Sequence, residues 1–153
     1  MEIEKKFLIK DMPDLSQYKM LRLEQAYMCT DPTIRIRRED DEYYMTYKGK
    51  GFMAKEEYNL PLTKENYEHL LPKCDGNIIR KNRYLIPLGP NKEGNELTAE
   101  LDVFDAPFAP LRFVEVEFPT IEEAESFVKP DWMGEDVTEK REYYNSYMSK
   151  QII

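Results

Sequence analysis

The sequence has few of the residues that build zinc sites or disulfide frameworks. It contains one histidine and two cysteines, Cys29 and Cys74, in 153 residues. Two cysteines do not make a disulfide framework, and zinc sites draw on sets of Cys and His ligands. The same shortage leaves no Cys–His or Ser–His pair as a candidate for nucleophilic catalysis. We therefore expect any functional chemistry to rest on carboxylates, lysines and arginines.

Long apolar runs are missing as well. No stretch approaches the roughly 18 to 20 apolar residues of a membrane span. The first ten residues, MEIEKKFLIK, are charged from the second position, unlike the apolar segment of a signal peptide. These absences predict a cytoplasmic protein with no membrane partner.

Positive charge is in the minority. The chain has 22 Lys and Arg against 30 Asp and Glu, which gives a net charge of −8. Such a surface repels a phosphate backbone, so nucleic acid is not an expected partner. A cleft can still carry a local field of the opposite sign where its walls concentrate Lys and Arg.

The length and composition suit one folded domain. Chains of about 100–150 residues commonly form a single domain, and 41% hydrophobic with 12% aromatic residues can close a core. The sequence shows no internal repeat, no low-complexity tract and no linker long enough to divide it. We expect a single domain over residues 1–153.

Alternation of apolar and charged residues, a period of two, dominates the chain and predicts strands. Turn residues such as Asp31 and Pro32 separate these segments. The expected strands are residues 2–9, 21–29, 33–39, 42–49, 53–61, 78–87, 96–104 and 111–118. Helical patterns cover Thr63 to about Leu71, Thr120 to Val128 and about Val137 to Lys150. The predicted fold is α+β but mainly β: a closed eight-stranded antiparallel β-barrel with helices packed outside, for which meander connections are the simplest topology.

Charged residues of like sign recur at spacing two along the expected strands. Residues i and i+2 lie on one face of a strand, so Arg35 and Arg37 share a face, as do Glu115 and Glu117. Any one such face could simply be the solvated side of a sheet. The set is harder to explain in that way, because like charges repel unless something of opposite sign lies between them. The same parity relates Glu2, Glu4 and Lys6, Lys55 and Glu57, Lys81 and Arg83, and Glu100 and Asp102.

A closed barrel would turn these charged faces inward and form a charged tunnel. Burying so many ions without partners is prohibitive, so the interior must stay wet or hold compensating ions. Arg and Lys suit phosphoryl oxygens, and carboxylates suit Mg²⁺ or Mn²⁺ rather than zinc. This predicts a polyanion bound with divalent metal, and phosphoryl chemistry in which a metal lowers the pKa of a water molecule.

Short charged and aromatic motifs follow one another along the chain. The opening Glu2-Ile3-Glu4-Lys5-Lys6 has the form ExExK. The segments after it are QAYM at 25–28, IRIR at 34–37, YKG at 47–49, KNRY at 81–84, ELDVF at 100–104, VEVEF at 114–118 and VT at 137–138 with YN at 144–145. In this order the motifs resemble those of the CYTH superfamily, also called triphosphate tunnel metalloenzymes, and the resemblance spans nearly the whole chain.

The resemblance implies an eight-stranded tunnel that hydrolyses or rearranges triphosphates with Mg²⁺ or Mn²⁺. The residues it marks as catalytic are Glu2, Glu4, Lys6 and Glu117. As metal ligands it implies Glu2, Glu4, Glu100, Asp102, Glu115 and Glu117. The phosphate-binding set it implies is Lys6, Arg35, Arg37, Lys48, Lys55, Lys81 and Arg83. Two positions depart from the pattern: Lys55 stands where the family often has arginine, and Asn59 where another acid is common.

The leading hypothesis is hydrolysis of inorganic tripolyphosphate, with nucleoside triphosphates as further substrates, because the short chain leaves little sequence for a nucleoside pocket. The alternatives are a class IV adenylate cyclase, a thiamine triphosphatase and a non-catalytic polyphosphate-binding module. A homodimer remains open: the pairs Tyr43-Tyr44 and Tyr143-Tyr144 could form its surface, although packing over the barrel explains them better.

Overall fold

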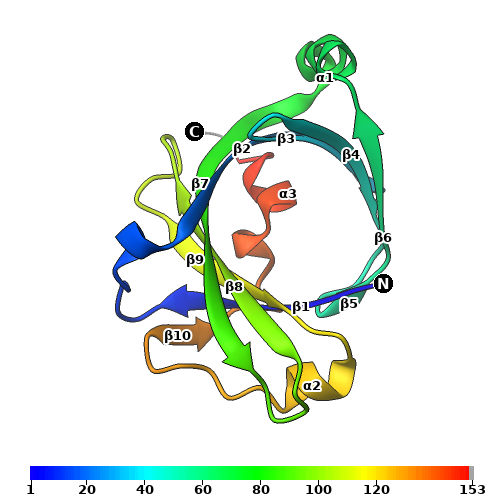
Figure 1. The fold of residues 1–153 in the computed structure, drawn as a ribbon. Helices are drawn as coiled ribbons and strands as arrows, with labels where there is room; N and C mark the ends of the chain where they lie inside the picture. The colour runs from blue at the N-terminus through cyan, green and yellow to red at the C-terminus, as the bar shows by residue number, and fades with distance from the viewer. Residues whose placement is uncertain (152–153) are drawn as a thin grey trace.

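The computed structural model describes residues 1–151 and is built mainly from strands (Figure 1). The strands are β1 (Glu2–Ile9), β2 (Lys19–Thr30), β3 (Thr33–Glu39), β4 (Glu42–Lys48), β5 (Ala54–Lys55), β6 (Glu57–Leu62), β7 (Asp75–Pro90), β8 (Glu96–Phe104), β9 (Arg112–Glu117) and β10 (Met133–Asp136). The helices are α1 (Lys64–Leu70), α2 (Ile121–Glu125) and α3 (Asn145–Met148), with 3₁₀ turns η1 (Leu15–Gln17), η2 (Leu71–Lys73) and η3 (Arg141–Tyr143).

The strands form a nearly closed antiparallel barrel. Their order is β10-β1-β9-β8-β7-β2-β3-β4-β6, and β5 pairs with β1 to bring the ring together (Figure 1). The predicted antiparallel barrel is thus confirmed. The expected strand at 53–61 is divided into β5 and β6, and β10 is an addition that the sequence pattern did not indicate.

The simple meander was wrong. Strand β1 lies beside β9, and strand β2 lies beside β7. The consecutive strands β1 and β2 are therefore not neighbours, as a meander would require. Short turns fix only local hairpins such as β2–β3 and β3–β4, whereas closing a ring brings together strands that are distant in sequence. Local turn signals therefore could not reveal these pairings.

The outer face of the barrel carries apolar clusters, and the inner face carries charged side chains except near α3, where a further apolar cluster includes Phe113 and Met148. On the outer face, Phe7, Leu101 and Val116 are buried in a hydrophobic cluster that α2 and β10 help to cover. A second outer cluster lies under α1, where the Tyr43 ring packs 5.2 Å from that of Tyr67. Burial of these outward residues stabilises the barrel and leaves its inner face free for charged side chains.

The two short helices α1 and α2 begin where the sequence predicts. Thr63 accepts a hydrogen bond from the backbone N–H of Asn66, and Thr120 accepts one from that of Glu123. Each cap satisfies a donor that the first helical turn leaves free. Helix α2 ends at Glu125, earlier than expected. Within residues 1–151, no helix is long and apolar enough to cross a membrane.

The single helix expected over 137–150 was wrong. Val137 and Thr138 stay hydrogen-bonded to Lys6 of β1, and the extended backbone of Tyr144 separates η3 from α3. Tertiary contacts therefore override helix propensity in this segment.

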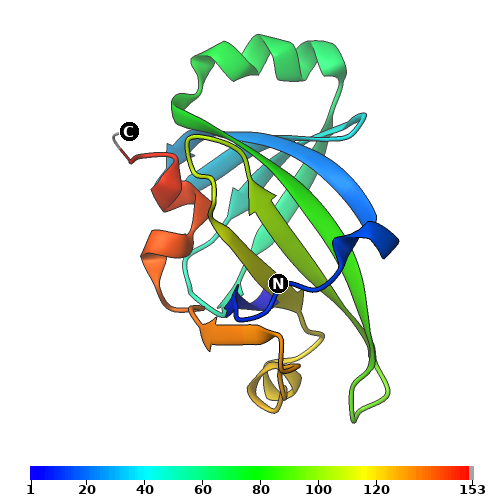
Figure 2. The same ribbon diagram turned by 90° about the vertical axis from the view of Figure 1, so that its left-hand side faces the viewer.

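The C-terminal segment, residues 137–151, lies across one mouth of the barrel. Figure 1 shows α3 within the ring of strands, and Figure 2, turned by 90°, places it at one end. The Asn77 N–H donates to the Ser149 carbonyl oxygen at 2.7 Å. At Gly76, φ is +75° and a Cβ would collide with the same carbonyl, so glycine permits this close approach.

Candidate functional site

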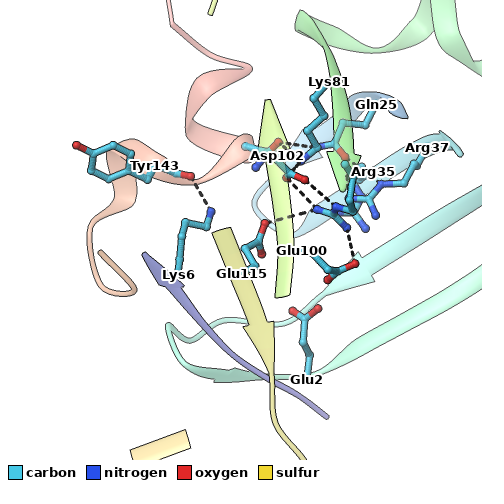
Figure 3. A network of polar contacts seen from close by, with 12 residues as sticks. Glu2, Lys6, Gln25, Arg35, Arg37, Lys81, Glu100, Asp102, Glu115 and Tyr143 are labelled. Atoms are coloured by element: carbon cyan, nitrogen blue, oxygen red, sulfur yellow. Dashed lines mark hydrogen bonds and ion pairs between the residues drawn. The ribbon is translucent and has the colours of Figure 1, made fainter. Parts of the chain in front are cut away.

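The barrel encloses a cavity of about 610 Å³ that charged side chains line from opposite walls. All seven residues of the predicted phosphate-binding set line it, together with Glu2, Glu4, Glu100 and Glu115. Asp102 and Glu117 do not line this cavity. The structure thus brings most of the predicted site together, from strands spread along the chain (Figure 3).

Four cations, Arg35 and Arg37 of β3 with Lys81 and Arg83 of β7, form the basic wall of the cavity, and one nitrogen of Arg35 lacks a hydrogen-bond partner. Arg35 is 6% exposed, its Nε has no hydrogen-bond partner, and its Nη2 lies 4.0 Å from Glu57. Burial, Arg35 and Arg83 lower the pKa of Arg37 to about 10. Buried donors and charges without partners are costly, so this wall suits an anion.

Asp102 lies behind the basic wall rather than in the cavity. Its two carboxylate oxygens accept hydrogen bonds from Arg83 Nε and Nη2 at 2.8 and 3.0 Å, and Lys81 Nζ lies 2.8 Å away. Burial favours its neutral form, but Arg83 and Lys81 hold its pKa below the ordinary value. Asp102 therefore acts as a counter-ion for two cations, a different place from that expected of a metal ligand.

Carboxylates of β1 and β9 form the acidic wall. Burial and the neighbouring Glu115 raise the pKa of Glu4 well above its ordinary value. Burial opposes ionisation of Glu115 too, yet Lys6 and Arg83 hold its pKa well below the ordinary value. Glu2 accepts a hydrogen bond from Lys48 Nζ at 3.1 Å. The carboxylates of this wall repel one another, and the raised pKa of Glu4 shows that a proton on this residue relieves part of that repulsion.

Glu117 is exposed and lies toward a second hollow. It pairs with Glu4 across β1 and β9, and it lines a hollow of about 510 Å³ with Glu96 and Glu100. Partial burial and the charges of Glu2 and other nearby acids raise the pKa of Glu117. Within residues 1–151, no group of three or more His, Cys, Asp or Glu side chains is arranged so that it could hold a metal ion.

The sequence interpretation gave no role in the site to four residues that contact it in the structure. These residues are Gln25, Tyr143, Tyr144 and Asn145. Lys6 Nζ donates to the Tyr143 carbonyl oxygen at 2.7 Å (Figure 3). The Tyr144 ring lies 4.7 Å from Lys55 Nζ, and Asn145 and Gln25 hydrogen-bond to each other. The motifs QAYM and YN contain three of these residues, but spacing alone does not show what they contact.

Fold and cavity together define an antiparallel tunnel protein with a charged interior. The family model described as the CYTH domain matches residues 1–151. The chain therefore belongs to the CYTH family, as its motifs predict.

Relatives share nearly the full length of the chain. An inorganic triphosphatase of Nitrosomonas europaea is 37% identical, with 99% of this chain and 98% of that protein covered. An inorganic triphosphatase of Acetivibrio thermocellus is 35% identical, with 97% and 93% covered. A crystal structure of an inorganic triphosphatase has a TM-score of 0.69 at 35% identity, covering 99% of this chain and 96% of that one.

Proposed function

We propose that this protein is a divalent-metal-dependent triphosphatase that hydrolyses inorganic tripolyphosphate inside the barrel. The observation that carries the proposal is Arg35, a buried guanidinium with an unpartnered Nε in a cavity lined by nine more lysine and arginine side chains. A chain of phosphoryl groups supplies the acceptors that this wall lacks. The names of the two bacterial relatives, both inorganic triphosphatases, support the same substrate class.

The donor chemistry of the acidic wall fits Mg²⁺ or Mn²⁺. Its side chains offer only carboxylate oxygens, the hard ligands these ions prefer. The raised pKa values of Glu4 and Glu117 reflect, beside burial, repulsion between carboxylates, which a divalent cation relieves. The residues that would hold it are Glu2, Glu4, Glu100, Glu115 and Glu117, whereas both oxygens of Asp102 are already engaged. When bound, the ion supplies positive charge to phosphoryl oxygens and acidifies water.

The residues of this chain bind and orient the substrate. Arg35, Arg37 and Arg83 offer planar guanidinium groups that can donate two hydrogen bonds to a phosphoryl group. Lys6 and Lys48 add point charges next to Glu115 and Glu2 of the acidic wall. Because the walls are fixed by the barrel, the charges are placed before the substrate arrives.

Substitution of Glu4 separates a hydrolase from a binding module. In Glu4→Gln, phosphate release from tripolyphosphate with Mg²⁺ should fall at least about 100-fold, since a carboxylate ligand is lost. Affinity for tripolyphosphate in chelator should stay within about threefold, because the basic wall is unchanged. Exposed Glu56→Gln, outside the cavity, is the matched control. Unaltered turnover in Glu4→Gln would overturn the catalytic role of the acidic wall.

A further inference from the structure

Asn145 of α3 reaches into the basic wall from the C-terminal segment. Its Oδ1 accepts hydrogen bonds from Lys81 Nζ at 2.9 Å and from Gln25 Nε2 at 2.8 Å. These two donors come from β7 and β2, more than 60 residues away in sequence. One amide oxygen therefore joins two strands of the barrel to the segment that covers its mouth.

The chain of hydrogen bonds continues to a second cation. Gln25 is completely buried, and its Oε1 accepts from Arg37 Nε at 3.0 Å and from Arg37 Nη2 at 2.7 Å. Lys81 and Arg37 are thus the two ends of a relay that runs through Asn145 and Gln25. Figure 3 shows Gln25 between the Lys81 and Arg37 side chains.

The chemistry of the two ends fixes the direction of every bond in the relay. Arginine and protonated lysine only donate, so with Lys81 protonated an oxygen must face each of them. Asn145 must turn its oxygen to Lys81, and Gln25 must turn its oxygen to Arg37. The Gln25 NH₂ group then has to donate to the oxygen of Asn145, as the structure shows. Only one arrangement of the amides satisfies all four groups.

The C-terminal segment has a further anchor outside the cavity. The N-cap of α3 is Tyr144, and the side chain of the following Asn145 bonds to Gln25 and Lys81 of the barrel. Asn77, outside the cavity, holds the same segment: its Nδ2 donates to the carbonyl oxygens of Met148 and Gln151 at 3.2 and 2.7 Å. Asn77 is absent from the cavity lining, whereas Asn145 belongs to it.

We propose that Asn145 and Gln25 are positioning residues, which hold Lys81 and Arg37 at a fixed separation to receive a phosphoryl group of the substrate. This inference rests on the proposed function for its substrate, tripolyphosphate. Protonated Lys81 and Arg37 repel each other, and their flexible side chains would otherwise spread over several rotamers. Fixing them beforehand removes that entropic cost from substrate binding.

A double-mutant cycle tests the relay. Asn145→Ala and Gln25→Ala should each raise the dissociation constant for tripolyphosphate, measured by calorimetry in chelator, about tenfold, and KM with Mg²⁺ should rise in parallel. The double variant should be no weaker than the weaker single variant, because either change breaks the same relay. Asn77→Ala should lower the melting temperature, but its affinity and KM should match those of the unaltered protein.

Other results of these measurements would contradict the relay, the hydrolase proposal, or both. A roughly hundredfold loss in the double variant, or a loss of affinity in Asn77→Ala equal to that in Asn145→Ala, would overturn the relay. Gln25→Ala approaches the relay from the barrel side, so it provides the test if Asn145→Ala fails to fold. Binding without hydrolysis by the unaltered protein would overturn the hydrolase proposal alone, since the affinities still decide the relay. Absence of tripolyphosphate binding would overturn both.

Discussion

The Asp102 carboxylate lies 2.8 Å from the Lys81 ammonium, and both side chains are almost completely buried. Arg83 engages the same carboxylate through two of its nitrogens. The basic wall thus carries a counter-ion on the side away from the cavity. This arrangement lets the protein hold concentrated positive charge in its interior while other donors remain directed at the cavity.

Asp102→Asn should destabilise the protein even without metal. The substitution leaves Lys81 and Arg83 buried with less compensation, and breaking such a network costs about 3–5 kcal/mol. Urea unfolding in the presence of chelator measures this loss of unfolding free energy. Glu100→Gln is the control, because Glu100 also contacts Arg83 but is partly exposed, and should cost less than about 1 kcal/mol. If Asp102→Asn keeps full stability in chelator and loses only stabilisation by Mg²⁺, Asp102 is a metal ligand after all.

The charge on Lys81 should make stability depend on pH. Burial lowers its pKa to about 7, far below the ordinary value. Between pH 7 and about 10 the unfolded chain holds a proton on this lysine that the folded chain does not, so the unfolding free energy rises with pH. Below pH 7 both states are protonated, and the dependence disappears.

Lys81→Met isolates this effect. The unfolding free energy of the unaltered protein minus that of Lys81→Met should rise by on the order of 2 kcal/mol from pH 6 to pH 9. Lys73→Met, an exposed lysine in η2, controls for the loss of a charge and should give no such rise. A difference that stays constant with pH would mean that Lys81 remains charged in the folded protein.

Arg35 should favour ligand binding at the expense of stability. Arg35→Met removes a buried charge whose Nε has no partner, so the free protein should unfold at an equal or higher urea concentration. Its affinity for tripolyphosphate should fall at least about tenfold. Calorimetry and urea unfolding of the same samples measure both quantities. Lower stability together with unchanged affinity would mean that Arg35 has a purely structural role.

The period of two along the strands was sufficient to predict the inner face of the barrel. Arg35 and Arg37, and likewise Lys81 and Arg83, were assigned to one face because alternation is a local property of a strand. Their assembly into one cavity followed from ring closure alone. The choice of which of these cations bind phosphate came from the resemblance to the CYTH family, and all seven of them line the cavity.

The features that the sequence could not predict depend on contacts between residues that are far apart in the chain. The relay from Asn145 to Gln25 joins residues 120 positions apart, and no local pattern encodes it. The C-terminal segment lacks its expected helix because Val137 and Thr138 remain bonded to Lys6 of β1. Asp102 also differs from its prediction for this reason. Alternation along a strand shows on which face a side chain lies, but not which side chains it contacts.

The most direct test of the account is phosphate release from tripolyphosphate, ATP and thiamine triphosphate side by side. Each substrate is supplied with Mg²⁺, with Mn²⁺ and with chelator, and cyclic AMP is monitored in the ATP sample. The account predicts strong release from tripolyphosphate that requires a divalent metal and disappears in Glu4→Gln. Cyclic AMP and pyrophosphate from ATP, or tight tripolyphosphate binding without turnover of any substrate, would contradict it.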